Sequence, residues 1–274
     1  MIAGIARENA MVDQARVERI AEFLDGVART RSNLPPLPPE VQPQDLDEAY
    51  GAQEILQTRW AQTRGPIVGY KIAITTPVMQ ELMGINHPCA GAIFQRFLYQ
   101  SPVTIRRSDY VNVAVECEIA MRLGADLPDR GQPYDREGVA AAVESCHAGI
   151  EIIEDQNAEY KKVSAAGLVA NNAWNGGAVF GPAVTEWRRL DLGGLAGVMT
   201  IEGVEQGRGK GADVLGHPLN ALAWLANNRV LRRRPLRKGM MILTGSIVST
   251  KWPKPGQTVR ATIEGLGEAV AKFA

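Results

Sequence analysis

One strand-like stretch, Val113–Met121, constrains this chain most, because two carboxylates interrupt a run that otherwise predicts a buried strand. Successive side chains of a strand point to opposite faces, so Glu116 and Glu118 share one face while valine, cysteine and isoleucine side chains fill the other. Two like charges on one face repel unless water or a cation lies between them. The pattern therefore predicts either a half-exposed strand with a polar outer face or a site for a hard divalent cation such as Mg²⁺ or Mn²⁺.

Two further charged residues stand inside apolar runs. Glu151 interrupts Gly149–Ile153, where an ionised carboxylate is costly to bury unless it is paired or ligated, although simple alternation would also place it on an exposed face. Lys71 is the only charge in Gly69–Ile74, and it either reaches out to water or lies beside a metal-bound anionic substrate. Three carboxylates without clustered histidines favour an oxygen-ligated ion over zinc.

The charges of the whole chain cancel, with 30 lysine and arginine residues against 30 aspartate and glutamate residues. No net field attracts nucleic acid or an anionic membrane surface, so a small-molecule partner is expected. The local cluster Arg232–Arg234, with Arg237 and Lys238, is most simply a solvated face. An odd number of cysteines without a Cys-x-x-Cys pair, an N-terminal segment without an apolar core and the lack of a membrane-length apolar run together predict a cytoplasmic protein with reduced thiols.

The character of the chain changes near residue 65, which predicts two parts. Residues 1–65 form an N-terminal helical region, with helical patterns over residues 12–27 and 45–64 and a proline-rich connector at Asn33–Pro39. Residues 66–274 form the catalytic domain and hold short apolar runs divided by glycine and proline, which are typical of strands. Strands outnumber helices and do not alternate with them, so the predicted class is α+β, with a curled β core and an N-terminal helical appendage.

Local patterns in the second part predict individual elements. A strand is expected over residues 92–99, and a helix over residues 136–146 is expected to lead into the run that holds Glu151. Residues 198–208 read as a hairpin with Glu202-Gly203 near its turn. Pro218 fits the first turn of a helix, since proline lacks only a donor that would be unpaired there.

Several stretches of the second part follow one another in a specific order. They are Gly69-Tyr70-Lys71-Ile72-Ala73-Ile74-Thr75, Val115-Glu116-Cys117-Glu118-Ile119-Ala120, Glu151, Gly207-Arg208-Gly209, Leu215-Gly216-His217-Pro218-Leu219-Asn220 and Leu243-Thr244-Gly245-Ser246. In this order and spacing, the chain resembles the fumarylacetoacetate hydrolase superfamily, specifically its 2-keto-4-pentenoate hydratase and 4-oxalocrotonate decarboxylase branch. The resemblance implies a mixed β-roll core, a homo-oligomer and a small-molecule 2-oxo acid as substrate.

The resemblance also implies a set of site residues. The ligands of Mg²⁺ or Mn²⁺ would be Glu116, Glu118 and Glu151. The catalytic residues would be Lys71 and Asn172. The substrate would contact Lys71, Ile72, Asn171 and Ser246.

The reaction implied by the resemblance is the hydration of a 2-hydroxy-2,4-dienoate, or its 2-oxo-4-enoate form, to a 4-hydroxy-2-oxo acid, as in meta-cleavage degradation of aromatic compounds. A 2-oxo-3-enedioate decarboxylase of the same branch needs the same stabilised dienolate, and an acylpyruvate-type C–C hydrolase uses the same metal site. C–C hydrolases of the superfamily usually carry aspartate as the third ligand, so Glu151 favours a lyase. Hydratases commonly carry Asp-Asn where this chain has Asn171-Asn172, and an acid near Cys89; a metal-dependent 2-oxo-acid-binding protein without turnover is therefore the non-enzyme alternative.

Overall fold

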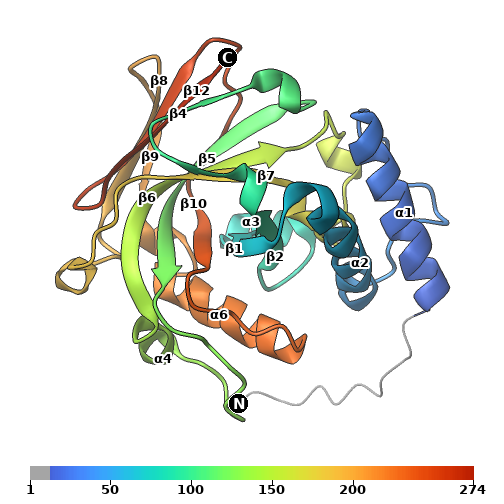
Figure 1. The fold of residues 1–274 in the computed structure, drawn as a ribbon, viewed down its shortest axis with the longest axis horizontal. Helices are drawn as coiled ribbons and strands as arrows, with labels where there is room; N and C mark the ends of the chain where they lie inside the picture. The colour runs from blue at the N-terminus through green and yellow to red at the C-terminus, as the bar shows by residue number, and fades with distance from the viewer. Residues whose placement is uncertain (1–12) are drawn as a thin grey trace.

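The computed structural model describes residues 13–274, and Figure 1 shows two N-terminal helices side by side at one end of the molecule. They are α1 (Gln14–Thr30) and α2 (Leu46–Arg64). Both predicted helices are confirmed, although residues 1–12, including the expected first helical residue Val12, lie outside the described part of the chain. Each helix begins after an aspartate, Asp13 or Asp45, whose side chain accepts hydrogen bonds from backbone N–H groups of the first turn. These N–H groups have no partner within the helix, so the caps fix where each helix starts.

A seven-stranded mixed sheet forms the centre of the fold, with strand order β2-β1-β10-β5-β6-β7-β3. The strands are β1 (Ile67–Ala73), β2 (Cys89–Phe94), β3 (Leu98–Gln100), β5 (Val113–Leu123), β6 (Val143–Glu154), β7 (Asn175–Phe180) and β10 (Met241–Lys251). β5 pairs antiparallel with both β10 and β6, and Arg122 is its only exposed residue. The alternative of a half-exposed strand with a polar outer face is therefore wrong, because other elements cover both faces of β5.

A five-stranded sheet packs against β5 and β6, and apolar residues of both sheets share one core. Its order is β4-β12-β11-β8-β9, with β4 (Val103–Ile105), β8 (Ala196–Ile201), β9 (Val204–Lys210), β11 (Thr258–Ile263) and β12 (Gly267–Phe273). The predicted hairpin is confirmed: β8 and β9 meet at Glu202-Gly203, where both φ angles are positive, as a tight two-residue hairpin turn requires. The two curled sheets with helices at the N-terminus confirm the α+β class with a mixed β-roll core.

Two local predictions are wrong. The helix expected over residues 136–146 ends early, as α4 (Arg136–Ala140), and β6 begins at Val143. Pairing of β6 with β5 along its whole length satisfies the backbone of these residues within the sheet, which outweighs a helical side-chain pattern. The strand expected over residues 92–99 is divided into β2 and β3 by a 3-10 turn at Gln95–Phe97.

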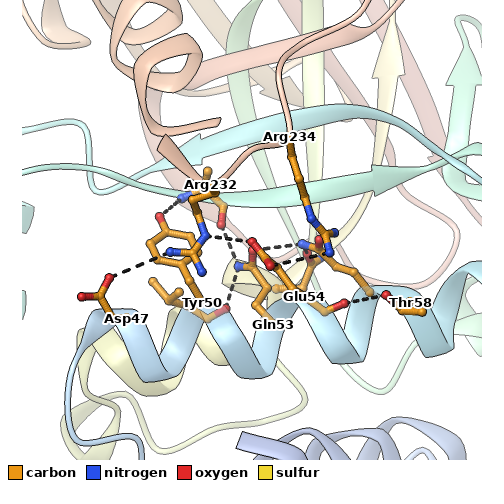
Figure 2. A network of polar contacts seen from close by, with 11 residues as sticks. Asp47, Tyr50, Gln53, Glu54, Thr58, Arg232 and Arg234 are labelled. Carbon is orange, nitrogen blue, oxygen red and sulfur yellow. Dashed lines mark hydrogen bonds and ion pairs between the residues drawn. The ribbon is translucent and has the colours of Figure 1, made fainter. Parts of the chain in front are cut away.

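The helix α6 (Pro218–Leu231) is tied to α2 by a polar network just beyond its C-terminal end (Figure 2). Arg232 Nε donates a hydrogen bond of 2.8 Å to one carboxylate oxygen of Glu54, and Arg234 lies 3.6 Å from the other oxygen. The Arg232 guanidinium also lies over the Tyr50 ring, 4.5 Å from its centroid. Arg232 and Arg234 therefore anchor two elements that are distant in sequence, whereas Arg233, Arg237 and Lys238 are exposed, so the interpretation as a solvated face is wrong only for the first two.

Two short helices border the region between the sheet and α2: α3 (Pro77–Met83) follows β1, and α5 (Ala165–Ala170) precedes β7. Buried apolar side chains of α1 and α2 belong to the same core as those of the sheets. The division into a helical region, 1–65, and a catalytic domain, 66–274, stays a prediction. In the described part of the chain, no helix combines the length and the apolar composition that crossing a membrane requires.

Candidate metal centre and active site

Three carboxylates meet on adjacent strands in the middle of the large sheet. Glu116 and Glu118 project from β5, and Glu151 on β6 stands directly opposite Glu116 in the antiparallel register. Glu118 is paired with Gly149, which has no side chain to fill the space. One oxygen from each carboxylate lies within 4.8 Å of the others. Sheet register therefore gathers the predicted metal ligands at one point.

The cluster is electrostatically unfavourable as it stands. Burial and the neighbouring carboxylate of Glu151 raise the pKa of Glu116 to about 7. Burial, Glu151 and Glu116 raise the pKa of Glu118 well above its ordinary value, while the Gly245 N–H, which donates to Glu118 Oε2 at 2.7 Å, opposes this rise. Buried like charges at such distances need an opposite charge among them.

Two carboxylate oxygens of the cluster have no hydrogen-bond partner. Glu118 Oε1 and Glu151 Oε2 are both buried, and no donor of the described residues reaches them. The opposite oxygens are occupied: Glu118 Oε2 accepts from Gly245, and Glu151 Oε1 accepts from Asn175 Nδ2 at 3.2 Å. Carboxylate oxygens that converge from three side chains, two of them buried and unpartnered, fit a divalent cation, because such ions take carboxylate ligands. The residues present can therefore hold a divalent metal ion.

Lys71 lies at the edge of the cluster. Its Nζ is 3.0 Å from Glu151 Oε1, and both side chains are buried. Burial alone would lower the pKa of Lys71, but the charges of Glu151 and Glu116 outweigh it and raise the pKa above its ordinary value. The ammonium therefore stays protonated and gives the acidic cluster one fixed cation, which excludes the alternative that Lys71 reaches out to water.

A cavity of about 410 Å³ opens over this cluster. Lys71, Ile72, Glu116 and Ser246 line it near the carboxylates. Most of the other side chains of its wall are apolar or aromatic, including Met79, Met83, Ile153, Tyr160, Val163, Leu168 and Trp174. A pocket of this size, with few polar groups at one end, suits a small organic molecule whose polar head points at the carboxylates.

Two predicted site residues point elsewhere. Asn172 is fully buried: its Oδ1 accepts from the Ala92 N–H and from Gln57 Nε2, and its Nδ2 donates to the Ala92 carbonyl. Asn171 donates to Gln156 Oε1 at 3.1 Å and lines a different cavity. Neither side chain lines the cavity over the carboxylates. Their catalytic and substrate-binding roles stay predictions, and these contacts favour positioning of the cavity wall.

The structure adds supporting residues that the sequence reasoning missed. The Thr250 hydroxyl donates to Glu116 Oε1, and Asn175 and Gly245 donate to the other two carboxylates. Gly245 has φ of +123°, and a Cβ atom there would lie 2.6 Å from the Thr75 side chain, so only glycine fits this close approach. The Leu243-Thr244-Gly245-Ser246 motif pointed to this place, but no pattern revealed which carboxylate its backbone serves.

Cys89, at the position where an acid is common in hydratases, is buried beside the site. Burial raises the pKa of its thiol to about 12, against an opposing effect of Lys71. The thiol therefore stays protonated near neutral pH and does not replace a carboxylate as a base.

Comparison with known sequences agrees with this geometry. The family model described as fumarylacetoacetate (FAA) hydrolase C-terminal matches residues 93–274. The chain is 32% identical over 263 residues to a 2-keto-4-pentenoate hydratase of Paraburkholderia phymatum, covering 96% of this chain and 99% of the relative. It is 29% identical over 266 residues to a 2-hydroxyhexa-2,4-dienoate hydratase of Comamonas testosteroni, again covering 96% of this chain and 99% of the relative.

Among solved structures, the fold is similar to that of 4-oxalocrotonate decarboxylase from Pseudomonas putida G7, complexed with magnesium and adipate. The TM-score is 0.87 at 26% sequence identity, covering 97% of this chain and 100% of the decarboxylase chain. The same decarboxylase is also known in complex with calcium and acetate. The match over residues 93–274 and these relatives show that the chain belongs to the fumarylacetoacetate hydrolase family, in the branch of these hydratases and this decarboxylase.

Proposed function

We propose that this protein is a hydro-lyase that adds water to a 2-hydroxy-2,4-dienoate, in its 2-oxo-4-enoate form, to give a 4-hydroxy-2-oxo acid. One observation carries the proposal: three carboxylates, two of them buried and one half-buried, have two unpartnered oxygens and lie beside a buried lysine at the end of a largely apolar cavity. This arrangement binds the acid end of a substrate at one place and its hydrocarbon part at another. The hydratase names of its sequence relatives support the same reaction.

The ligands of the ion, Mg²⁺ or Mn²⁺, would be Glu116, Glu118 and Glu151. When bound, the ion would supply Lewis-acid stabilisation of the negative charge that develops on the 2-oxygen of the substrate. Lys71 Nζ, held by Glu151 Oε1, donates a hydrogen bond to the anionic substrate and delivers a proton to carbon during ketonisation. The apolar wall packs against the hydrocarbon part of the substrate and orients it relative to the carboxylates.

The charge of the cavity favours a hydratase over a decarboxylase. Among residues 13–274, Lys71 is the only basic residue that lines it, and it already pairs with Glu151. A second carboxylate at the far end of the substrate would meet apolar side chains there and lose its hydration without a partner. The decarboxylase remains the second candidate, because the fold is so similar to that of a decarboxylase complexed with adipate, a dicarboxylate.

We also infer that the protein works in the cytoplasm as a homo-oligomer. Three buried, unbridged cysteines support a reducing compartment. The family resemblance supports the assembly, and light scattering of the purified protein tests it.

A product assay tests the reaction. Purified protein with Mn²⁺ is incubated with 2-hydroxypenta-2,4-dienoate and, separately, with a dicarboxylated dienoate, while dienol absorbance and released CO₂ are followed. A hydratase converts the first substrate to a 4-hydroxy-2-oxo acid without CO₂. Release of CO₂ from the second substrate alone would favour the decarboxylase, and binding without turnover of either would leave the acylpyruvate-type C–C hydrolase or a 2-oxo-acid-binding protein.

A further inference from the structure

A second cavity, of about 420 Å³, borders the same segment, Asn171–Asn175, that borders the active-site cavity. Residues near the C-terminal ends of α1 and α2, the turn at Gln95–Phe97 and the end of β6 surround it. Trp174 lines both cavities. The second cavity is therefore adjacent to the active-site cavity, and apart from Trp174 its lining residues are different.

Basic side chains dominate the charge of this cavity. Five arginines line it: Arg29, Arg31, Arg59, Arg64 and Arg96. The first three are ion-paired, at 3.1, 4.0 and 2.9 Å, with Asp25, Asp109 and Glu18. The remaining acid of the wall, Glu154, already accepts hydrogen bonds from the backbone N–H groups of Val111, Asn112 and Gln156. Within residues 13–274, no carboxylate forms an ion pair with Arg64 or Arg96.

The two unpaired guanidinium groups both lie near the Phe97 ring. Arg64 stacks on the Trp60 ring at 3.5 Å from its centroid, and it lies 5.8 Å from the centroid of Phe97. Arg96 lies 5.9 Å from the same Phe97 centroid. Burial lowers the pKa of Arg64 to about 10, with Asp25 and Glu154 opposing this and Arg96 adding to it. Arg64 is thus charged at neutral pH but forms no ion pair with any described carboxylate.

We propose that this cavity binds a small organic oxyanion, a carboxylate or phosphate, held by Arg64 and Arg96. Planar guanidinium groups with several N–H donors match both kinds of oxyanion. The stacking of Arg64 on Trp60 fixes its plane, and the aromatic side chains Phe97 and Trp174 can cover the carbon part of the ligand. The volume suits a small molecule rather than a peptide or nucleic acid.

The site has a physical connection to the metal centre, and this part rests on the proposed metal site. Asn175 lines the second cavity and donates to Glu151 Oε1. The three residues directly before Asn175, which are Asn172, Ala173 and Trp174, all have positive φ angles, between 47° and 57°. Such a strained wall between two ligand sites is a place where one ligand can alter the other. Bound oxyanion is therefore expected to change metal affinity through Asn175.

Oxyanion binding is measured on protein freed of divalent ions by chelation and dialysis, because the three carboxylates of the empty metal centre then repel anions. Inorganic phosphate and succinate are titrated separately, with calorimetry and tryptophan fluorescence as readouts. We expect saturable binding of at least one of them, weakened about tenfold in Arg64→Gln and severalfold in Arg96→Gln. Arg189→Gln, whose side chain is 82% exposed, is the matched control and should bind like wild type.

The outcomes separate the possibilities. Binding of phosphate alone identifies a phosphorylated ligand, and binding of succinate alone identifies a carboxylic acid. Failure of both anions to bind, or equal binding by all variants, overturns the proposal. If Arg64→Gln does not fold, Arg96→Gln decides, because Arg96 is exposed and its loss leaves no cavity in the core. Mn²⁺ titration of the same variants tests the metal site independently, so the two proposals can fail separately.

Discussion

Two cavities beside the Asn171–Asn175 segment are nearly equal in volume, about 410 and 420 Å³, but have opposite chemistry. The first has Glu116 of the carboxylate cluster at one end and a largely apolar wall elsewhere. The second is lined by five arginines, of which two lack an ion-pair partner in the described chain. The difference teaches that uncompensated charge, rather than size, distinguishes the proposed ligands: a divalent cation at the carboxylates beside the first cavity and an oxyanion in the second.

Of the changes considered, removal of a carboxylate ligand should have the largest effect on the first cavity, because it should reduce both metal binding and activity. Glu151→Gln replaces an anionic ligand and also removes the partner of Lys71, so Mn²⁺ binding and dienoate hydration should fall together, by about a hundredfold or more. Calorimetry with Mn²⁺ and the dienol absorbance assay measure the two losses. Glu186→Gln, at a 70% exposed side chain, is the control. Wild-type metal affinity in Glu151→Gln would refute the proposed ligand set.

Removing the lysine should separate metal binding from chemistry. Lys71→Met leaves all three carboxylates in place but deletes the proton donor, so kcat should fall by about a hundredfold to ten-thousandfold. Mn²⁺ should still bind, because the loss of a nearby cation does not remove any ligand. Steady-state kinetics and a parallel metal titration check this. A kcat close to that of wild type would exclude Lys71 as the proton donor.

Gly245→Ala tests whether the backbone behind the acidic site is as constrained as its geometry indicates. The new Cβ would meet the Thr75 side chain at 2.6 Å in a backbone conformation that alanine resists, so the free energy of unfolding should fall by about 2 to 4 kcal/mol. Gly256→Ala, also at positive φ but facing open space, should cost only about 1 kcal/mol. Urea unfolding of both variants gives the comparison, and equal losses would mean that the close contact with Thr75 is unimportant.

The smallest expected effect comes from placing a positive charge in the apolar wall. Met79→Lys, on α3, gives a distant substrate carboxylate a partner, so the preference for a dicarboxylated dienoate over 2-hydroxypenta-2,4-dienoate should rise about tenfold in kcat/KM or in affinity. Val78→Lys, one residue away and 74% exposed, does not line the cavity and serves as the control. The same rise in both variants would point to general electrostatic attraction instead of a specific contact.

The residues of the carboxylate cluster beside the first cavity could be predicted from the sequence. Alternation along a strand places Glu116 and Glu118 on one face, and a charge inside an apolar run marks Glu151 and Lys71. Alternation along a strand could not predict that Glu151 lies opposite Glu116, because this pairing depends on the register of two strands. Family resemblance supplied the grouping, and the geometry then explained it.

The arginine-lined second cavity could not be predicted from the sequence. The second cavity draws its residues from segments far apart in the chain, and no local pattern joins Arg64 to Arg96. The directions of the Asn171 and Asn172 side chains depend on successive left-handed backbone residues, which ordinary propensities disfavour. The family motif placed these asparagines near the reaction, but this turn directs them toward Gln156 and Ala92.

The opposition of Glu116 and Glu151 on β5 and β6 also bears on how the chain reaches its native state. A slip of one residue between these strands would send one carboxylate to the opposite face of the sheet and destroy the cluster. Only the correctly aligned sheet would bring the three carboxylates together around an ion, and ion binding would shift the population away from misaligned forms. For this protein, a supply of divalent ions during synthesis would therefore favour chains in which β5 and β6 have the native register.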